Sequence, residues 1–131
     1  MPRTINKIVV HCSDSPHGRN DGAEQIHSWH VQRGWSGIGY HYVINEYGIL
    51  ENGRPQYWIG AHVEGHNKDS LGICMIGVDK FTQEQFDTLE YTIRELLKKY
   101  PGATVCGHRD LDTHGKTCPN FDVKDWWAKV K

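Results

Sequence analysis

The stretch FTQEQFDTLEYTIRELLKKYPG, residues 81–102, carries the strongest structural signal in the chain. Thr82 and Gln85 have the spacing of a capping box, in which each side chain bonds the other residue's backbone amide at a helix N-terminus. Phe81 and Phe86 have the spacing of a hydrophobic staple. Apolar residues then recur on one helical face until the Pro-Gly pair stops the helix: Phe86, Leu89, Ile93, Leu96, Leu97 and Tyr100. The pattern predicts an amphipathic helix that lies across a sheet.

Two further helices are predicted, one on each side of this stretch. The first follows Asp21, which can act as its N-cap with Glu24 at the third helical position, and Gly34 ends it. One face of this helix carries Ile26, Trp29 and His30. The last helix follows Asp122 as N-cap, and Phe121 is placed to pack on it. This helix carries Trp126, Trp127 and Val130.

Short apolar runs between these helices predict the strands of one sheet. The predicted strands are residues 5–11, 40–45, 48–52, 70–77 and 103–108. The second and third form a hairpin that turns at Glu46-Tyr47. Strands and helices alternate without repeats, and 131 residues suffice for one compact core. The sequence therefore predicts a single α/β domain, residues 1–131, with a central mixed β-sheet flanked by about three helices.

The composition argues against several classes of protein. An apolar fraction of 37%, a charged fraction of 24% and a mean hydropathy of -0.65 are typical of a soluble globular protein, so we expect no membrane span. The formal net charge of -1 gives no electrostatic basis for binding nucleic acid. The N-terminal residues have Lys7 inside a very short apolar run and no small-residue cleavage site. We therefore expect no secretory signal peptide and a protein that is cytoplasmic as synthesised.

The four cysteines are expected to be reduced. A cytosolic chain of this size does not need disulfides. Cys12, Cys74 and Cys106 lie in apolar, strand-like runs, where a thiol acts as a small buried hydrophobic group. Only Cys118 has neighbours that resemble those of a metal ligand.

A group of potential metal ligands lies in GHRDLDTHGKTCPNFD, residues 107–122, together with a distant histidine. His11 and His108 each end a predicted strand, so the two imidazoles converge at one sheet edge if these strands are neighbours. With Cys118 they would leave the fourth position of a tetrahedral zinc ion to water or substrate, as in catalytic zinc sites. For each histidine taken singly, an ordinary solvated or hydrogen-bonded side chain remains the alternative.

Four blocks of sequence, in order and across nearly the whole chain, resemble the zinc-dependent N-acetylmuramoyl-L-alanine amidases. They are VHCS (10–13), GYHYVIN (39–45), IGAHVEGHNKDSLGICMIG (59–77) and GHRD with GKTCPNFD (107–122). The family includes amidase-type lysozymes of bacteriophages and peptidoglycan recognition proteins. The resemblance implies one Zn²⁺ bound by His11, His108 and Cys118, with Tyr40 and Lys116 as catalytic side chains. It also implies cleavage of the amide between N-acetylmuramic acid and L-alanine in peptidoglycan.

The roles of the two catalytic candidates are compatible with this chemistry. A cationic Lys116 can stabilise the oxyanion of a tetrahedral intermediate. Tyr40 can bond the attacking water or the oxyanion, or pass a proton to the leaving amine. Without the resemblance, Tyr40 would be read as a half-buried strand tyrosine and Lys116 as a solvated loop lysine.

Three residues are candidates for contact with the substrate. The resemblance places His62 beside the substrate cleft, and Trp35 and Trp58 are aromatic side chains that could line it. The loop between the second and third metal ligands is slightly longer than in the phage relatives and contains Asp112 and His114. Ligation by His114 would close the site to water, so we do not expect it.

The sequence thus predicts a phage or prophage endolysin, acting as a monomer on peptidoglycan after release through a membrane lesion made by another protein. One alternative is a peptidoglycan-binding module of the same fold that does not cleave; it would lack a metal ligand or the Tyr/Lys pair, and this chain keeps all five residues. Another is a regulator that binds phage RNA polymerase, as one phage relative does. Because the chain begins only a few residues before its first predicted strand, we expect no counterpart of that relative's longer N-terminal arm and no polymerase binding.

Overall fold

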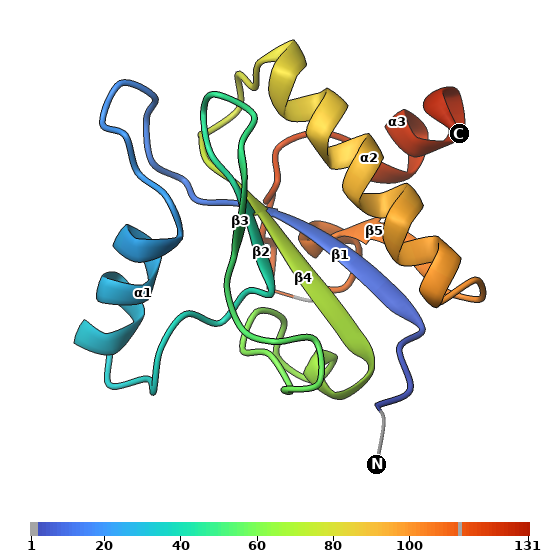
Figure 1. Ribbon diagram of the computed structural model, residues 1–131, viewed down its shortest axis with the longest axis horizontal. Helices are drawn as coiled ribbons and strands as arrows, with labels where there is room; N and C mark the ends of the chain where they lie inside the picture. Colours follow the sequence, from blue (N-terminus) through green and yellow to red (C-terminus); the bar gives the residue numbers. More distant parts are fainter. Residues whose placement is uncertain (1–2, 113) are drawn as a thin grey trace.

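The computed structural model describes residues 3–112 and 114–131 and contains one mixed β-sheet with helices on both faces (Figure 1). The strands are β1 (Lys7–Cys12), β2 (Tyr42–Ile44), β3 (Leu50–Asn52), β4 (Ser70–Met75) and β5 (Thr104–Gly107). Their order in the sheet is β3-β2-β4-β1-β5, and only the β2–β3 pairing is antiparallel among those described. The helices are α1 (Ala23–Gln32), α2 (Gln83–Lys99) and α3 (Val123–Val130). The predicted α/β fold with about three helices is confirmed.

Helix α2 forms as its local sequence predicts. Thr82 is the N-cap, and the reciprocal bonds of the capping box with Gln85 are both present. The rings of Phe81 and Phe86 pack with their centroids 6.1 Å apart, which confirms the staple. The apolar stripe of the helix packs on β1, β4 and β5 in the main core. Helix α3 begins after Asp122, whose side chain accepts the backbone N–H of Asp125, and joins the same core.

The N-terminus of α1 differs from the prediction. Gly22 is the N-cap and makes no side-chain cap bond, while Asp21 lies 3.3 Å from Arg19 in an ion pair. The backbone N–H of Ala23 instead donates to Oε1 of Glu51, at 2.7 Å. A carboxylate from the β2–β3 hairpin therefore satisfies the start of α1, and the prediction of an Asp21 cap was wrong.

All five strands are shorter than predicted, and two candidate residues, Tyr40 and His108, therefore lie just outside a strand. Strand β2 begins at Tyr42, so Tyr40 lies in the extended segment before the strand and not within it. This segment is still tied to its neighbours, because the backbone N–H of Arg54 donates to the carbonyl of Tyr40. Strand β5 ends at Gly107, and His108 begins the short 3-10 helix His108–Asp110.

The two faces of β1 and β4 enter different environments. Side chains of a strand alternate between faces, and Ile8, Val10, Leu71, Ile73 and Met75 all face the core beneath α2 and α3. On the opposite face, Cys74 packs with Ile26 of α1 and Val43 of β2, while Val9 packs with Val63 and Cys106. His11 follows Val9 on this second face, so the functional candidates lie on the side away from the main core.

No helix in the described ranges 3–112 and 114–131 has the length and apolar character needed to cross a membrane.

Candidate active site

The three predicted metal ligands meet at one end of the sheet. Strands β1 and β5 are parallel neighbours with Val10 opposite Gly107, so the next residue along β1 lies beside the first residue after β5. The ring centroids of His11 and His108 are 4.7 Å apart. Cys118 comes from the loop that follows, and one ligand atom from each residue lies within 4.8 Å of the other two. The convergence expected from the sequence is confirmed.

The thiol of Cys118 is held in place by the end of β1. The backbone N–H of Cys12 donates to Sγ of Cys118 at 3.0 Å, and the two Sγ atoms are 3.5 Å apart. On the other side of the loop, the carbonyl of Cys118 accepts the backbone N–H of Arg109. Cys12 is buried as predicted, but its contact with a ligand could not be seen in the sequence. All four cysteines are free thiols in the structure.

The protonation states of these groups suit a zinc ion. Burial, with the neighbouring His62 and His108 rings, lowers the pKa of His11 well below its usual value, and burial lowers the pKa of His108. Both rings are therefore neutral near pH 7 and have a lone pair to donate. The hydrogen-bonded partner Cys12 and burial raise the pKa of the Cys118 thiol, but coordination by zinc deprotonates a thiol outright. Imidazole and thiolate are donors that Zn²⁺ accepts readily, so the residues fit this ion.

The other buried thiol near the site is a weaker candidate. Cys106 packs with Val9, Val63 and Leu111 under the site, and burial raises its pKa to about 11. It is not among the three residues whose ligand atoms converge. The structure therefore places Cys106 as the buried thiol that the sequence suggested.

Tyr40 lies directly against His11, one of the three predicted metal ligands. Its ring centroid is 5.0 Å from that of His11. Burial and the nearby thiols of Cys74, Cys118 and Cys12 raise the pKa of Tyr40 well above its usual value. The phenol therefore stays protonated and can donate a hydrogen bond to an oxygen atom at the site.

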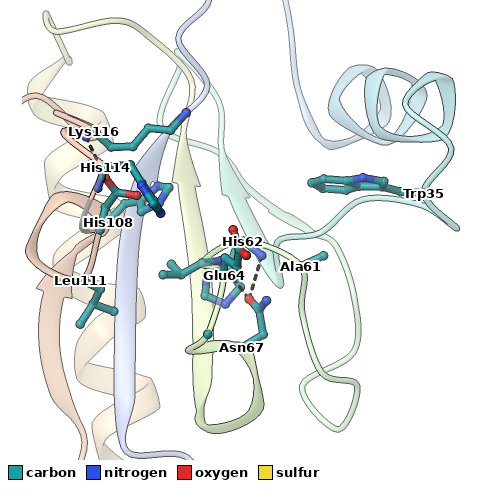
Figure 2. Close-up of a pocket in the computed structure, with 12 residues that line it drawn as sticks. Trp35, Ala61, His62, Glu64, Asn67, His108, Leu111, His114 and Lys116 are labelled. Atoms are coloured by element: carbon teal, nitrogen blue, oxygen red, sulfur yellow. Dashed lines mark hydrogen bonds between the residues drawn. The ribbon is translucent and has the colours of Figure 1, made fainter.

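A cavity of about 780 Å³ opens beside this centre (Figure 2). Figure 2 shows Lys116, His114 and His108 on one side of the cavity and Trp35 on the other. The lining residues are Trp35, Ala61, His62, Val63, Glu64, Gly65, Asn67, His108, Leu111, Asp112, His114 and Lys116. Lys116 is thus brought to the cavity, as the resemblance implied.

The loop that carries Lys116 is organised by Asp112. Oδ2 of Asp112 accepts the backbone N–H of both His114 and Lys116, at 2.8 and 2.9 Å. His114 lines the cavity but is not in the converging group of ligands. The role of Asp112 in shaping this loop was missed from the sequence, because the bonds are made only in the folded loop.

The structure brings two of the three substrate-contact candidates, Trp35 and His62, to the cavity. Trp35 lines the cavity and is 38% exposed. Trp58 is exposed, but its side chain does not line this cavity in the part of the chain that the structure describes; its role in substrate binding stays a prediction. His62 lines the cavity and is largely buried, with its ring in contact with His11. Glu64 also lines the cavity and was not predicted from the sequence to do so.

Comparison with known proteins identifies the family. Residues 1–121 match the family described as N-acetylmuramoyl-L-alanine amidase. The chain belongs to this amidase family. The endolysins of Enterobacteria phage T3 and Escherichia phage T7 are 37% and 38% identical to it over 134 residues, which is 96% of this chain and 87% of each relative.

A solved amidase structure agrees with the fold. The N-acetylmuramoyl-L-alanine amidase LysC from Clostridium intestinale URNW superposes with a TM-score of 0.87 at 33% identity, covering 98% of this chain and 86% of that one. The predicted family, the amidase-type α/β fold and the amidase activity are therefore confirmed. The individual roles of the site residues stay predictions.

Proposed function

We propose that this chain hydrolyses the amide between N-acetylmuramic acid and L-alanine in peptidoglycan, using one zinc ion, and acts as an endolysin. The observation that carries the proposal is the convergence of His11, His108 and Cys118. Tyr40 packs against His11, and Lys116 lines the same cavity as His108. A non-cleaving binding module would not require all five groups at one place.

His11, His108 and Cys118 would hold the metal, and a set of three protein ligands would leave one coordination position for water or substrate. When bound there, Zn²⁺ supplies a Lewis acid that polarises the substrate carbonyl and makes water acidic enough to attack near neutral pH. The backbone N–H of Cys12 stabilises the negative charge on Sγ of Cys118. The chain therefore provides both the ligands and a hydrogen bond that favours the thiolate.

Tyr40 and Lys116 are proposed to divide the remaining work. The protonated phenol of Tyr40, next to His11, donates a hydrogen bond to the oxygen of the carbonyl as negative charge develops on it. Lys116, on the loop that also carries Cys118, lines the cavity on the same side as His108 and adds a positive charge there. Both interactions strengthen in the transition state, which is the condition for raising the turnover number.

The cavity is proposed to hold the sugar and stem peptide. Trp35 offers an aromatic surface at one side, and polar side chains line the rest. The protein is proposed to act as a monomer, made in the cytoplasm and reaching peptidoglycan through a membrane lesion that another protein makes.

Mass spectrometry of digested peptidoglycan tests this function. Purified peptidoglycan treated with the protein should release stem peptides that begin with a free L-alanine amine. A zinc chelator should abolish the release, and added Zn²⁺ should restore it. Binding without release would favour the non-cleaving module, and release that is indifferent to chelation would contradict the zinc mechanism.

A further inference from the structure

His62 makes a contact that its place on the cavity wall does not explain. Its Nδ1 lies 2.8 Å from Nε2 of His11, across 51 residues of sequence. The two rings meet edge to face, with an interplanar angle of 84°. We propose that His62 is a positioning residue of the metal centre: it accepts the Nε2–H of His11 and so leaves Nδ1 of His11 to bind the metal. This inference rests on the proposed zinc site.

The direction of the hydrogen bonds follows from Ser70. The Oγ of Ser70 lies 2.7 Å from the carbonyl oxygen of His66, and since a carbonyl only accepts, the hydroxyl proton is used there. The same Oγ lies 3.2 Å from Nε2 of His62, so the Oγ accepts a hydrogen bond from the Nε2–H of His62. A neutral imidazole has one N–H, so Nδ1 of His62 is an acceptor.

The chain of bonds then fixes the tautomer of His11. Because Nδ1 of His62 accepts, the proton between the two rings belongs to Nε2 of His11. The remaining nitrogen of His11, Nδ1, has the free lone pair. Ligating histidines commonly donate their second N–H to a protein acceptor, which orients the ring and makes it a better ligand. In this chain the acceptor is a second histidine.

The fold holds the His62 ring in this position. A Cβ on Gly72 of β4 would come within 2.7 Å of Cγ of His62, and a Cβ on Gly60 within 2.7 Å of its Cδ2. The backbone N–H groups of His62 and Val63 both donate to Oδ1 of Asn67, which fixes the loop (Figure 2). Two glycines thus make room for the ring, and one asparagine sets the backbone that carries it.

This arrangement changes the assignment of His62. Both of its ring nitrogens are engaged within the protein, one with Ser70 and one with His11. They have no free donor or acceptor to offer a substrate. The ring therefore acts on the reaction through His11.

Zinc affinity and the tautomer of His11 test the proposal together. His62→Phe keeps a ring but removes the acceptor, and zinc binding measured by competition with a chromophoric chelator should weaken about 10- to 100-fold. His62→Asn restores an acceptor near the Nδ1 position and should recover most of the affinity. In the zinc-bound wild type, long-range ¹H–¹⁵N correlation spectra should show His11 with its proton on Nε2.

Two controls keep the result interpretable. His66→Phe makes the same change on the same loop, where His66 enters the network through its backbone carbonyl, and should leave zinc affinity unchanged. Ser70→Ala removes the acceptor of the His62 proton without placing a larger group in the core, and should weaken zinc binding even if His62→Phe does not fold.

The outcomes separate the two proposals. If the wild type binds zinc and Cys118→Ser does not, but His62→Phe and Ser70→Ala bind it as tightly as His66→Phe, the role of His62 is refuted and the zinc site stands. A His11 proton on Nδ1 would refute it equally. If Cys118→Ser binds zinc like the wild type, the zinc site itself is wrong and both proposals fall.

Discussion

The two faces of the central strands are equally buried but chemically opposite. On one face of β1 and β4, Ile8, Val10, Leu71, Ile73 and Met75 are fully buried beneath α2 and α3. On the other face, His11 and Ser70 are 1% and 0% exposed, yet they are polar. Apolar contact stabilises the first face, whereas the polar atoms on the second face can be buried without a large free-energy cost only when they have hydrogen-bond partners.

The difference shows how one sheet can combine stability with reactivity. The face beneath α2 and α3 contributes the main hydrophobic core, and the buried polar side chain of Gln85 is satisfied there by a hydrogen bond to the carbonyl of Ile76. The opposite face is covered by α1 and by loops. Hydrogen bonds on this face hold His11, His62 and Cys118 in defined orientations. Substitutions on the two faces should therefore change different measured quantities.

Loss of a metal ligand should produce the largest effect. Cys118→Ser should weaken zinc binding at least about 1,000-fold, or ~4 kcal/mol, because the loss of a ligand exceeds the 10- to 100-fold expected for an outer contact. Cys106→Ser, in the small cluster under the site, should change zinc affinity far less. Competition with a chelator measures both, and the reverse order would show that Cys106 is the ligand.

A cavity in the core beneath α2 and α3 should reduce stability without altering the site. Ile93 of α2 is fully buried in the main core. Ile93→Ala should lower the free energy of unfolding by about 3 kcal/mol, as measured by denaturant titration. Tyr91→Ala, on the exposed side of the same helix, is the matched control. Zinc affinity should stay unchanged in both variants, and a large loss in Ile93→Ala would mean that the two faces are coupled.

Removal of the cavity lysine should affect turnover alone. Lys116→Ala should lower the turnover number about 100-fold, or ~2.7 kcal/mol, because a charge that stabilises the oxyanion is lost. It should keep zinc affinity and stability. Lys129→Ala, on α3 and paired with Asp125, should have wild-type turnover. Equal turnover in Lys116→Ala would return this residue to an ordinary surface lysine.

Acid should destabilise the protein through two buried histidines, one on α1 and one just before β2. Burial lowers the pKa of His30 and of His41 to about 4, below the ordinary value of 6.5. The folded protein therefore binds fewer protons than the unfolded chain, so stability is complete above pH 6.5 and falls as the pH drops from 6.5 towards 4. Each of the two rings should lower the free energy of unfolding by about 1 kcal/mol as the pH falls from 7 to 5.5.

A single variant checks this pH dependence. His30 accepts the backbone N–H of Gly39, and His30→Asn keeps an acceptor while removing one titrating group. Denaturant titrations at pH 7 and pH 5.5 should show a smaller loss of stability in this variant. A loss equal to that of the wild type would mean that His30 already binds a proton in the folded protein.

The helices α2 and α3 could be predicted from the sequence because their signals are local. The capping box at Thr82 and the stripe on α2 lie within one helix, and Asp122 caps α3 from the adjacent position. The cap of α1 could not be predicted, because Glu51 supplies it from a hairpin 28 residues away. Local spacing contains no information on such a partner.

The site was predicted in its residues but not in its hydrogen bonds. The predicted strand ends at His11 and His108, together with the family resemblance, were enough to predict that these residues converge with Cys118. The contact of Cys12 with Cys118 and that of His62 with His11 depend on which loops return to the end of β1. Pairings across 106 and 51 residues arise only in the folded chain.

Anomalous X-ray diffraction at the zinc absorption edge, from crystals of the zinc-loaded protein, tests the central claim most directly. The claim is that the face of the sheet opposite α2 and α3 carries a zinc amidase centre. We expect one ion bound by Nδ1 of His11, a ring nitrogen of His108 and Sγ of Cys118, with one coordination position not filled by protein. An ion bound by Cys106 or His114, or by Nε2 of His11, would contradict the account.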